Sequence, residues 1–186
     1  MHENNYFPKY IHASNTSWTL KKNFWEYFNT LRLWIWFYWI NTLDTKDEFY
    51  EIWKKLKLSL SLDSTLVVKK SLQAWTKVGY NCNYTMPFDW DIWVVSLWYY
   101  EWIPRCLKDF CLNYNWKKIK IIWKICMNLT IIDLTWIDDI KVWDKINIIS
   151  NNVDDFNNIY NFAKKSNTIP YENLVKLSES IRRELK

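Results

Sequence analysis

The chain has 186 residues and a formal net charge of +5, and 49% of its residues are hydrophobic while 24% are charged. This length allows one domain with a hydrophobic core, and the composition excludes disordered and collagen-like chains. The positive charge is milder than that of most dedicated RNA-binding domains. We expect a polar, extended N-terminal arm over residues 1–17 and a single globular domain over residues 18–186.

Three segments follow the arm. Apolar side chains at Leu20, Phe24, Trp25 and Phe28 form one stripe and predict a helix over 17–29. Residues 31–43 are almost all aromatic or aliphatic, which fits a strand or a buried helix. Residues 45–48 read Thr-Lys-Asp-Glu, a capping box that predicts a helix over 46–58.

The middle of the chain is predicted to be mainly helical. Asp63 or Ser64 can cap a helix that runs to Val78, and Gly79 then occupies the left-handed position after its end. Residues 81–89 form a loop in this prediction. An aromatic helix over 91–101 and a helix from Pro104 to Leu112 follow.

The pattern changes to alternation near residue 118. Over 118–127 one face is apolar and the other is basic, which predicts a strand: the apolar face holds Ile119, Ile121, Trp123, Ile125 and Met127, and the basic face holds Lys118, Lys120 and Lys124. Residues 131–136 and 141–149 are further candidate strands. Asn152 can cap a helix over 153–165, and Pro170 opens a last helix. The fold class expected from these elements is α+β, helix-rich, with a small sheet in the C-terminal half.

Candidate catalytic groups are sparse. The two histidines, His2 and His12, lie in the arm, and the single glycine rules out a glycine-rich phosphate loop. Cys106 and Cys111 lack a second close pair of ligands, which argues against zinc. We therefore expect no enzyme activity, no catalytic residues, no metal and no cofactor.

Basic residues cluster in three places, and lysines along a strand face can follow a phosphate backbone. The alternative is that these clusters are ordinary solvated faces. The candidate RNA contacts are Lys117, Lys118, Lys120, Lys124, Trp116, Lys69, Lys70, Arg182 and Arg183. The succession Trp34, Trp36 and Trp39 is a candidate protein interface, because tryptophan is enriched at interfaces.

Tryptophan is abundant where glycine is scarce: the chain has 15 Trp and one Gly. Scarcity of residues with GC-rich codons indicates an AT-rich gene. We interpret the excess of tryptophan as the reading of UGA as a second Trp codon, which occurs in many mitochondria and in mycoplasma-like bacteria. This composition resembles that of proteins encoded in ciliate mitochondrial genomes.

A shorter resemblance lies between Tyr99 and Asn128. There the order Tyr-Tyr-Glu, Phe-x-x-Asn-Tyr-Asn and Ile-Lys-Ile is similar to the opening of the central-protuberance protein of the large ribosomal subunit. These resemblances imply an organelle-encoded, non-catalytic subunit of the mitochondrial ribosome, bound to rRNA and neighbouring ribosomal proteins in an obligate hetero-assembly. The alternatives are a soluble or membrane-peripheral accessory subunit of a respiratory-chain complex, or a protein of a UGA-reading bacterium. No transmembrane span is expected, because the most apolar stretch, 31–43, is too short.

Overall fold

The computed structural model describes residues 8–21, 28–82, 84–122, 125–127, 129–135 and 137–185. The chain divides into two compact units, Met1–Ser59 and Leu60–Lys186. The division into an extended arm over residues 1–17 and a domain over 18–186 stays a prediction. Each unit is described by itself below.

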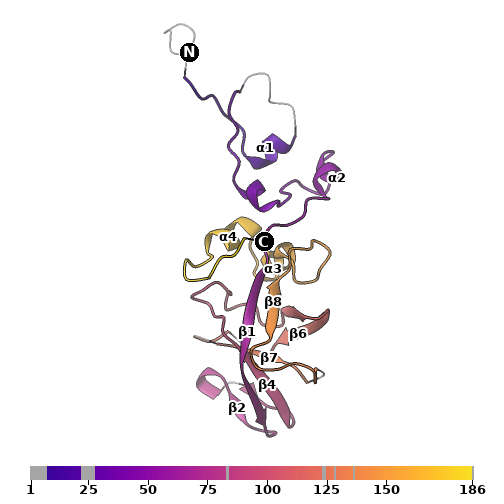
Figure 1. The fold of residues 1–186 in the computed structure, drawn as a ribbon, viewed down its shortest axis with the longest axis vertical. Helices are drawn as coiled ribbons and strands as arrows, with labels where there is room; N and C mark the ends of the chain where they lie inside the picture. Colours follow the sequence, from indigo (N-terminus) through magenta and orange to yellow (C-terminus); the bar gives the residue numbers. More distant parts are fainter. Residues whose placement is uncertain are drawn as a thin grey trace. The chain divides into compact units, whose positions relative to one another are not determined.

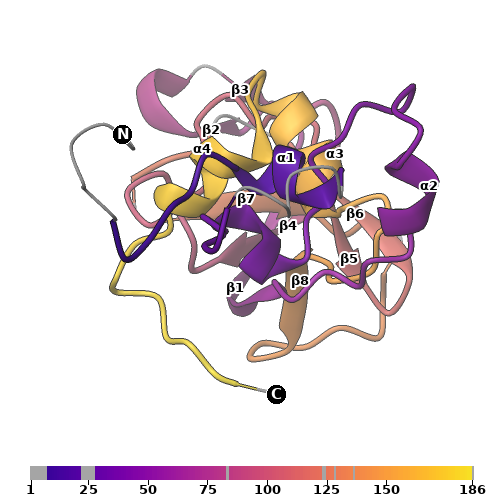
Figure 2. The ribbon, with the colours of Figure 1, turned by 90° about the horizontal axis from the view of Figure 1, so that it is seen from above.

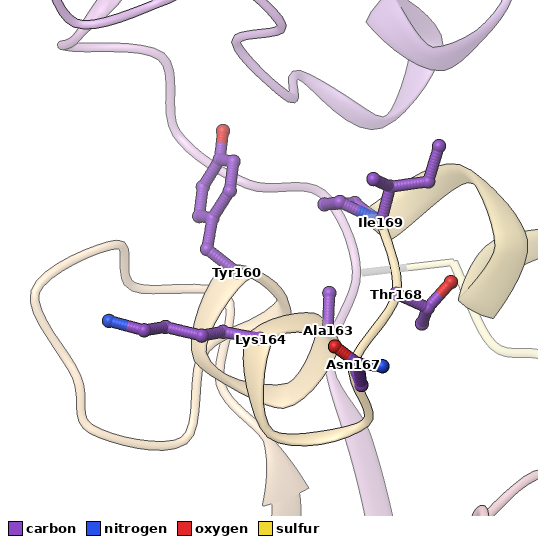
Figure 3. Close-up of a pocket in the computed structure, with 7 residues that line it drawn as sticks. Tyr160, Ala163, Lys164, Asn167, Thr168 and Ile169 are labelled. Atoms are coloured by element: carbon purple, nitrogen blue, oxygen red, sulfur yellow. The ribbon is translucent and has the colours of Figure 1, made fainter.

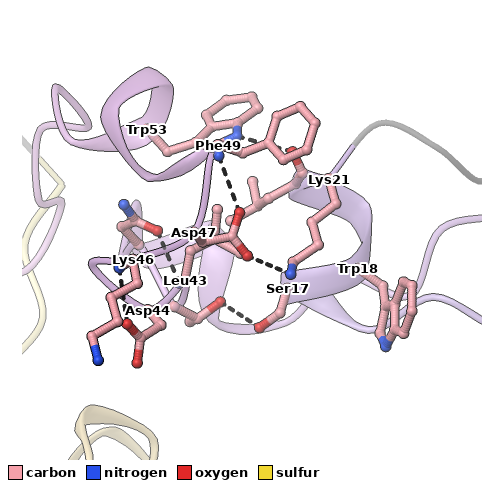
Figure 4. Close-up of polar contacts among 12 residues, drawn as sticks. Ser17, Trp18, Lys21, Leu43, Asp44, Lys46, Asp47, Phe49 and Trp53 are labelled. Carbon is pink, nitrogen blue, oxygen red and sulfur yellow. Dashed lines mark hydrogen bonds and ion pairs between the residues drawn. The ribbon is translucent and has the colours of Figure 1, made fainter.

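The first unit contains three short helical elements, α1 (Thr16–Leu20), η2 (Ile35–Tyr38) and α2 (Tyr50–Trp53). Polar contacts connect the end of α1 to α2 and the residues before it, as Figure 4 shows: the Lys21 ammonium pairs with the Asp47 carboxylate, and the Trp53 indole N–H donates to the Leu20 carbonyl at 3.0 Å. The Asn15 side chain caps α1 by accepting the Trp18 backbone N–H at 3.0 Å. The unit is therefore held together largely by side-chain bonds rather than by long helices.

The helix predicted over 46–58 is reduced to α2. The Asp44 carboxylate accepts the Lys46 N–H at 2.9 Å, and the Asp47 carboxylate accepts the Phe49 N–H at 3.0 Å. Such local bonds offer the backbone an alternative to the helix. Residues 31–43 contribute only η2, and residues 22–27 of the helix predicted over 17–29 lie outside the described residues.

The second unit is a closed antiparallel β-barrel (Figure 1). Around the barrel its strands run in the order β1 (Leu62–Leu72), β4 (Trp90–Val95), β7 (Thr130–Asp133), β6 (Lys117–Ile121), β5 (Cys111–Tyr114) and β8 (Lys145–Ile149). The short strands β2 (Lys77–Val78) and β3 (Tyr84–Thr85) pair separately, with η3 (Tyr80–Cys82) between them.

The long strand β1 closes the barrel because its two halves have different partners. Residues 62–65 pair with β8, and residues 66–72 pair with β4, with irregular register near Leu62 and Leu66. Alternate side chains fill the interior, as in small barrels generally. Fully buried examples are Leu66, Leu112, Ile119, Ile121, Ile146 and Ile148.

The predicted helix-rich α+β class is wrong, because the second unit is mostly sheet. The helix expected over 63–78 is β1 and β2, that over 91–101 begins with β4, and that over 104–112 ends in β5. Pairing between distant strands overrides the local helical pattern in these segments. The predicted strands at 118–127, 131–136 and 141–149 correspond to β6, β7 and β8, with residues 123, 124 and 136 outside the described part.

Two helices lie at the end of the barrel away from β2 (Figure 1): α3 (Ile159–Lys165) and α4 (Pro170–Val175). The cap of α3 is Asn158, whose side chain accepts the Asn161 N–H at 2.9 Å, and not Asn152 as predicted. Pro170 begins α4 as expected, but residues 176–185 continue without a helix, and Figure 2 shows them running away from α4. Within the described residues, no helix combines the length and the apolar character needed to cross a bilayer.

Candidate functional site

The loop over residues 96–105 is the first part of the connection from β4 to β5, and hydrogen bonds hold it at two points. The Thr130 hydroxyl donates to the Leu97 carbonyl at 2.5 Å, which ties the start of the loop to β7. The Trp102 indole N–H donates to the Asn173 carbonyl in α4 at 2.6 Å, and its ring stacks on Phe162 of α3 at 4.4 Å. Because these bonds are buried, the loop is positioned by the barrel and both helices.

Glu101 is an unusual group in this loop. Its side chain is partly buried, and its Oε2 is buried without a hydrogen-bond partner in the described structure. Burial raises the pKa of this carboxyl above its ordinary value, opposed by a hydrogen bond from the backbone at Trp98. Unsatisfied buried groups and shifted pKa values gather at functional sites, which makes the loop our candidate site.

Two phenols precede Glu101. The rings of Tyr99 and Tyr100 both lie against Trp98, with centroid distances of 5.5 and 5.3 Å. Tyr99 is 44% exposed and Tyr100 is 71% exposed, so Tyr99 is the more closely held of the two. The loop thus presents three consecutive groups that can donate or accept protons.

The raised pKa of Glu101 predicts a specific pH dependence of stability. The folded state binds the Glu101 proton more tightly than the unfolded state, so this group's favourable contribution is complete below the unfolded pKa. The contribution is lost as pH rises through the raised folded pKa. We expect the free energy of unfolding of the Glu101→Gln variant not to show this loss. Urea unfolding of the parent protein and of the variant between about pH 4 and 8 measures the difference.

The difference between the pH dependence of the unfolding free energy of the parent and that of Glu101→Gln reports Glu101 alone. Asp91, Asp109 and Asp139 have pKa values lowered by hydrogen bonds, chiefly from Ser71, Lys120 and Lys117 respectively, and their stabilisation is lost as pH falls. These groups are present in both proteins and cancel in the comparison. Equal pH slopes for the parent and Glu101→Gln would contradict the assignment.

Two hollows lie beside the helices. The first, of about 470 Å³, is lined by Tyr160, Ala163, Lys164, Asn167, Thr168, Ile169 and Pro170, and Figure 3 shows these side chains around the turn between α3 and α4. The second, of about 430 Å³, is lined by Asp109, Phe110, Cys111, Lys118, Phe156, Asn161, Lys164 and Lys165. The lysines at both hollows are exposed to solvent.

No group of three His, Cys, Asp or Glu suited to a metal ion occurs among the residues whose placement is described. Cys82, Cys106, Cys111 and Cys126 are free thiols. The protein therefore shows no candidate metal centre in that part of the chain.

The candidate RNA contacts are dispersed over the barrel surface and its C-terminal tail. Lys117 pairs with Asp139 at 3.0 Å, Lys120 with Asp109 at 3.0 Å and Lys69 with Asp91 at 2.9 Å. These carboxylates offset part of the positive charge that the sequence suggested. The ammonium of Lys118 instead lies 4.9 Å from the centre of the Phe156 ring.

The other candidates occupy separate places. Lys70 is exposed on β1, Trp116 is exposed at the β5–β6 turn, Arg182 pairs with Glu184 at 3.1 Å, and Arg183 is exposed; Lys124 lies outside the described residues. Contact of these residues with nucleic acid stays a prediction.

The candidate interface tryptophans lie in the first unit. Trp36 contacts Trp39 and Trp53, with ring-centre distances of 6.1 and 5.6 Å. Trp34 and Trp39 are each about half exposed. Their role as a protein interface stays a prediction.

Comparison with known proteins identifies the family. The family model described as "Alanine racemase, C-terminal domain" matches residues 59–185, which coincides with the barrel unit. The alanine racemase of Staphylococcus saprophyticus is 32% identical over 176 residues, covering 95% of this chain and 45% of the relative. The chain belongs to the alanine racemase C-terminal domain family.

Solved structures support the same assignment. Alanine racemase from Bacillus anthracis with bound L-Ala-P has a TM-score of 0.81 and 25% identity, covering 95% of this chain and 45% of that one. Alanine racemase from Bartonella henselae with covalently bound pyridoxal phosphate has a TM-score of 0.68 and 22% identity, covering 82% of this chain and 40% of that one. The second comparison shows the shared fold alone.

These findings correct the functional interpretation of the sequence. The expected ribosomal subunit and the alternative respiratory subunit are both wrong, because the family is one of enzymes. The expected absence of enzymatic character, the rRNA and ribosomal-protein partners, and the obligate hetero-assembly are wrong for the same reason. Organelle encoding is wrong as well, since the relatives are bacterial proteins.

The sequence interpretation missed the loop over 96–105 as a site. Tyr99, Tyr100 and Glu101 were noticed only for their similarity to a ribosomal protein. The available signal was a run of three consecutive residues that can donate or accept protons. What the sequence did not show was the burial of Glu101, which depends on helices far along the chain.

Proposed function

We propose that this chain acts as the C-terminal part of an alanine racemase, an enzyme that interconverts L- and D-alanine. The observation that carries the proposal is the family match over residues 59–185, which covers the whole barrel. The chain spans about half the length of the curated relatives it matches, with 45% of the Staphylococcus saprophyticus protein covered. The activity is accordingly proposed for the whole enzyme.

Pyridoxal phosphate is the cofactor that the Bartonella henselae relative carries covalently. A lysine that forms a Schiff base is commonly activated by desolvation in an apolar pocket. No lysine is buried in the described part of this chain, and the lysines at both hollows are exposed. The described residues of this chain by themselves therefore do not fit this cofactor.

Racemisation of alanine requires loss of the proton on Cα and return of a proton to the opposite face. The reaction needs groups that accept and donate a proton on the two sides of the substrate. We assign one such role to the Tyr99 phenol, because Tyr99 is more closely held than Tyr100 and belongs to the anchored loop. A positioned acid or base is more effective than a mobile one.

The test is an assay of the purified natural enzyme supplied with pyridoxal phosphate. With L-alanine in D₂O, we expect D-alanine to form and deuterium to enter at Cα. L-Serine serves as a competing substrate that reports specificity. Absence of both D-alanine and deuterium exchange, from a folded protein, would overturn the proposal.

A further inference from the structure

The backbone at four tryptophans has a conformation that tryptophan avoids. Positive φ angles occur at Trp39 (54°), Trp75 (67°), Trp116 (67°) and Trp143 (79°). For L-residues with a bulky side chain this left-handed region is a genuine outlier, since the Cβ approaches the carbonyl oxygen. Only glycine adopts it freely, whereas Asn and Asp tolerate it.

Trp116 occupies the glycine position of a two-residue hairpin. Asn115 and Trp116 connect β5 to β6, and both have positive φ angles, of 47° and 67°. Positive φ at both central residues defines the type I′ turn, for which Asn-Gly is the strongest sequence signal. The chain has the asparagine in its usual place and a tryptophan where the glycine belongs.

Trp75 and Trp143 occupy the glycine position of another turn type. The Thr76 N–H donates to the Gln73 carbonyl at 3.2 Å, and the Asp144 N–H donates to the Lys141 carbonyl at 3.1 Å. Each tryptophan is the third residue of its turn, the position at which a type II turn requires positive φ and therefore favours glycine.

Trp39 ends η2 in the left-handed conformation, with its N–H bonded to the Trp36 carbonyl at 2.8 Å. Helices commonly end at a left-handed glycine. All four side chains are exposed, from 48% at Trp39 to 78% at Trp75, so little burial offsets the backbone strain.

The amino-acid composition also points to glycine at tryptophan positions, independently of the backbone angles. The 15 Trp and the single Gly together occupy a share of the chain close to the roughly 7% that glycine alone takes in ordinary proteins. The glycine codon GGA and the codon UGA differ in one base, and an AT-rich gene favours the second. Scarce glycine and abundant tryptophan thus have one common explanation.

We propose that positions 39, 75, 116 and 143 are glycine in the protein made by its own cell, because their codon is UGA and the cell inserts glycine there. This replaces our interpretation of UGA as a second tryptophan codon. These four tryptophans are the ones whose described backbone has a positive φ angle. Any other tryptophan specified by UGA would be glycine as well. The experiment below determines the residue and the codon at each of these positions.

The direct test is peptide mass spectrometry of the protein purified from its own organism, together with the codons of its gene. We expect peptides that contain the four positions to be lighter by the difference between a tryptophan and a glycine residue, and each position to carry UGA. Tryptophan in any of the four peptides, or UGG at any of the four codons, overturns the proposal.

A matched pair of variants tests the steric premise. Trp39 and Trp18 are similarly exposed, at 48% and 51%, but Trp39 is left-handed while Trp18 lies within α1. Relief of left-handed strain in Trp39→Gly should raise the midpoint of thermal unfolding by about 2–4 °C. Trp18→Gly should lower it, because glycine weakens a helix.

The barrel offers a second strained position for the same measurement. Trp116→Gly should also raise the midpoint, since Asn-Gly is the preferred sequence of its turn. If Trp39→Gly and Trp116→Gly both lower the midpoint as Trp18→Gly does, the conformational argument fails and the proposal is overturned.

Discussion

Replacing Tyr99 by phenylalanine should lower kcat for alanine racemisation by about 10²–10⁴-fold, the usual contribution of a positioned acid or base. The variant removes the phenol that we assign to proton transfer and leaves the ring against Trp98, 5.5 Å away. The measurement is the rate of D-alanine formation by the whole enzyme at saturating L-alanine. The bulk of the loss should lie in kcat rather than KM, because the phenol acts during proton transfer.

The matched control for Tyr99→Phe is Tyr100→Phe. Tyr100 lies against the same Trp98 ring but is 71% exposed, and we expect its loss to change kcat little. Equal effects of the two substitutions would contradict the assignment of Tyr99. Racemisation that persists in Tyr99→Phe would leave the proposed activity intact and would remove only the role given to this residue.

Replacing Phe162 by alanine should destabilise the barrel unit by about 3–5 kcal/mol, the usual cost of truncating a buried phenylalanine. Phe162 of α3 is fully buried, stacks on Trp102 and meets Phe110 edge-on at 5.4 Å. The substitution removes the side chain that packs α3 against the loop over 96–105. Urea unfolding measures the free-energy change directly.

Phe88→Ala is the matched control for Phe162→Ala. Phe88 is 52% exposed and contacts Trp90 at 4.7 Å, so we expect a loss of only about 1 kcal/mol. A comparable loss in the two variants would show that α3 is not packed on the barrel as described. Because Trp102 belongs to the same cluster, Phe162→Ala should also lower racemase activity by loosening the loop.

Parts of the fold were readable from local pattern. The alternation of isoleucine and lysine over 118–121 predicted β6, because side chains of a strand alternate between the two faces of its sheet. Proline at position 170 predicted the start of α4, since its missing N–H is not needed in the first turn. Gly79 does have the positive φ expected of it, although it follows a strand rather than a helix.

The candidate site depended on contacts that no local pattern contains. Glu101 becomes partly buried in a loop that Asn173 and Phe162 anchor through Trp102, and these residues lie 60 or more positions away in the chain. Local reading assigned residues 91–101 to one helix. That assignment concealed both the end of β4 and the loop that carries the three proton-carrying groups.

The sequence by itself determined where strongly patterned elements lie, and it showed the excess of tryptophan over glycine. Tertiary structure alone decided that β1 pairs with both β8 and β4, which closes the barrel. It also decided that four of the tryptophans have the positive φ angles that favour glycine. The physical reason is that strand pairing and turn geometry are set by partners distant in the chain, whereas side-chain periodicity reports only the preference of each segment.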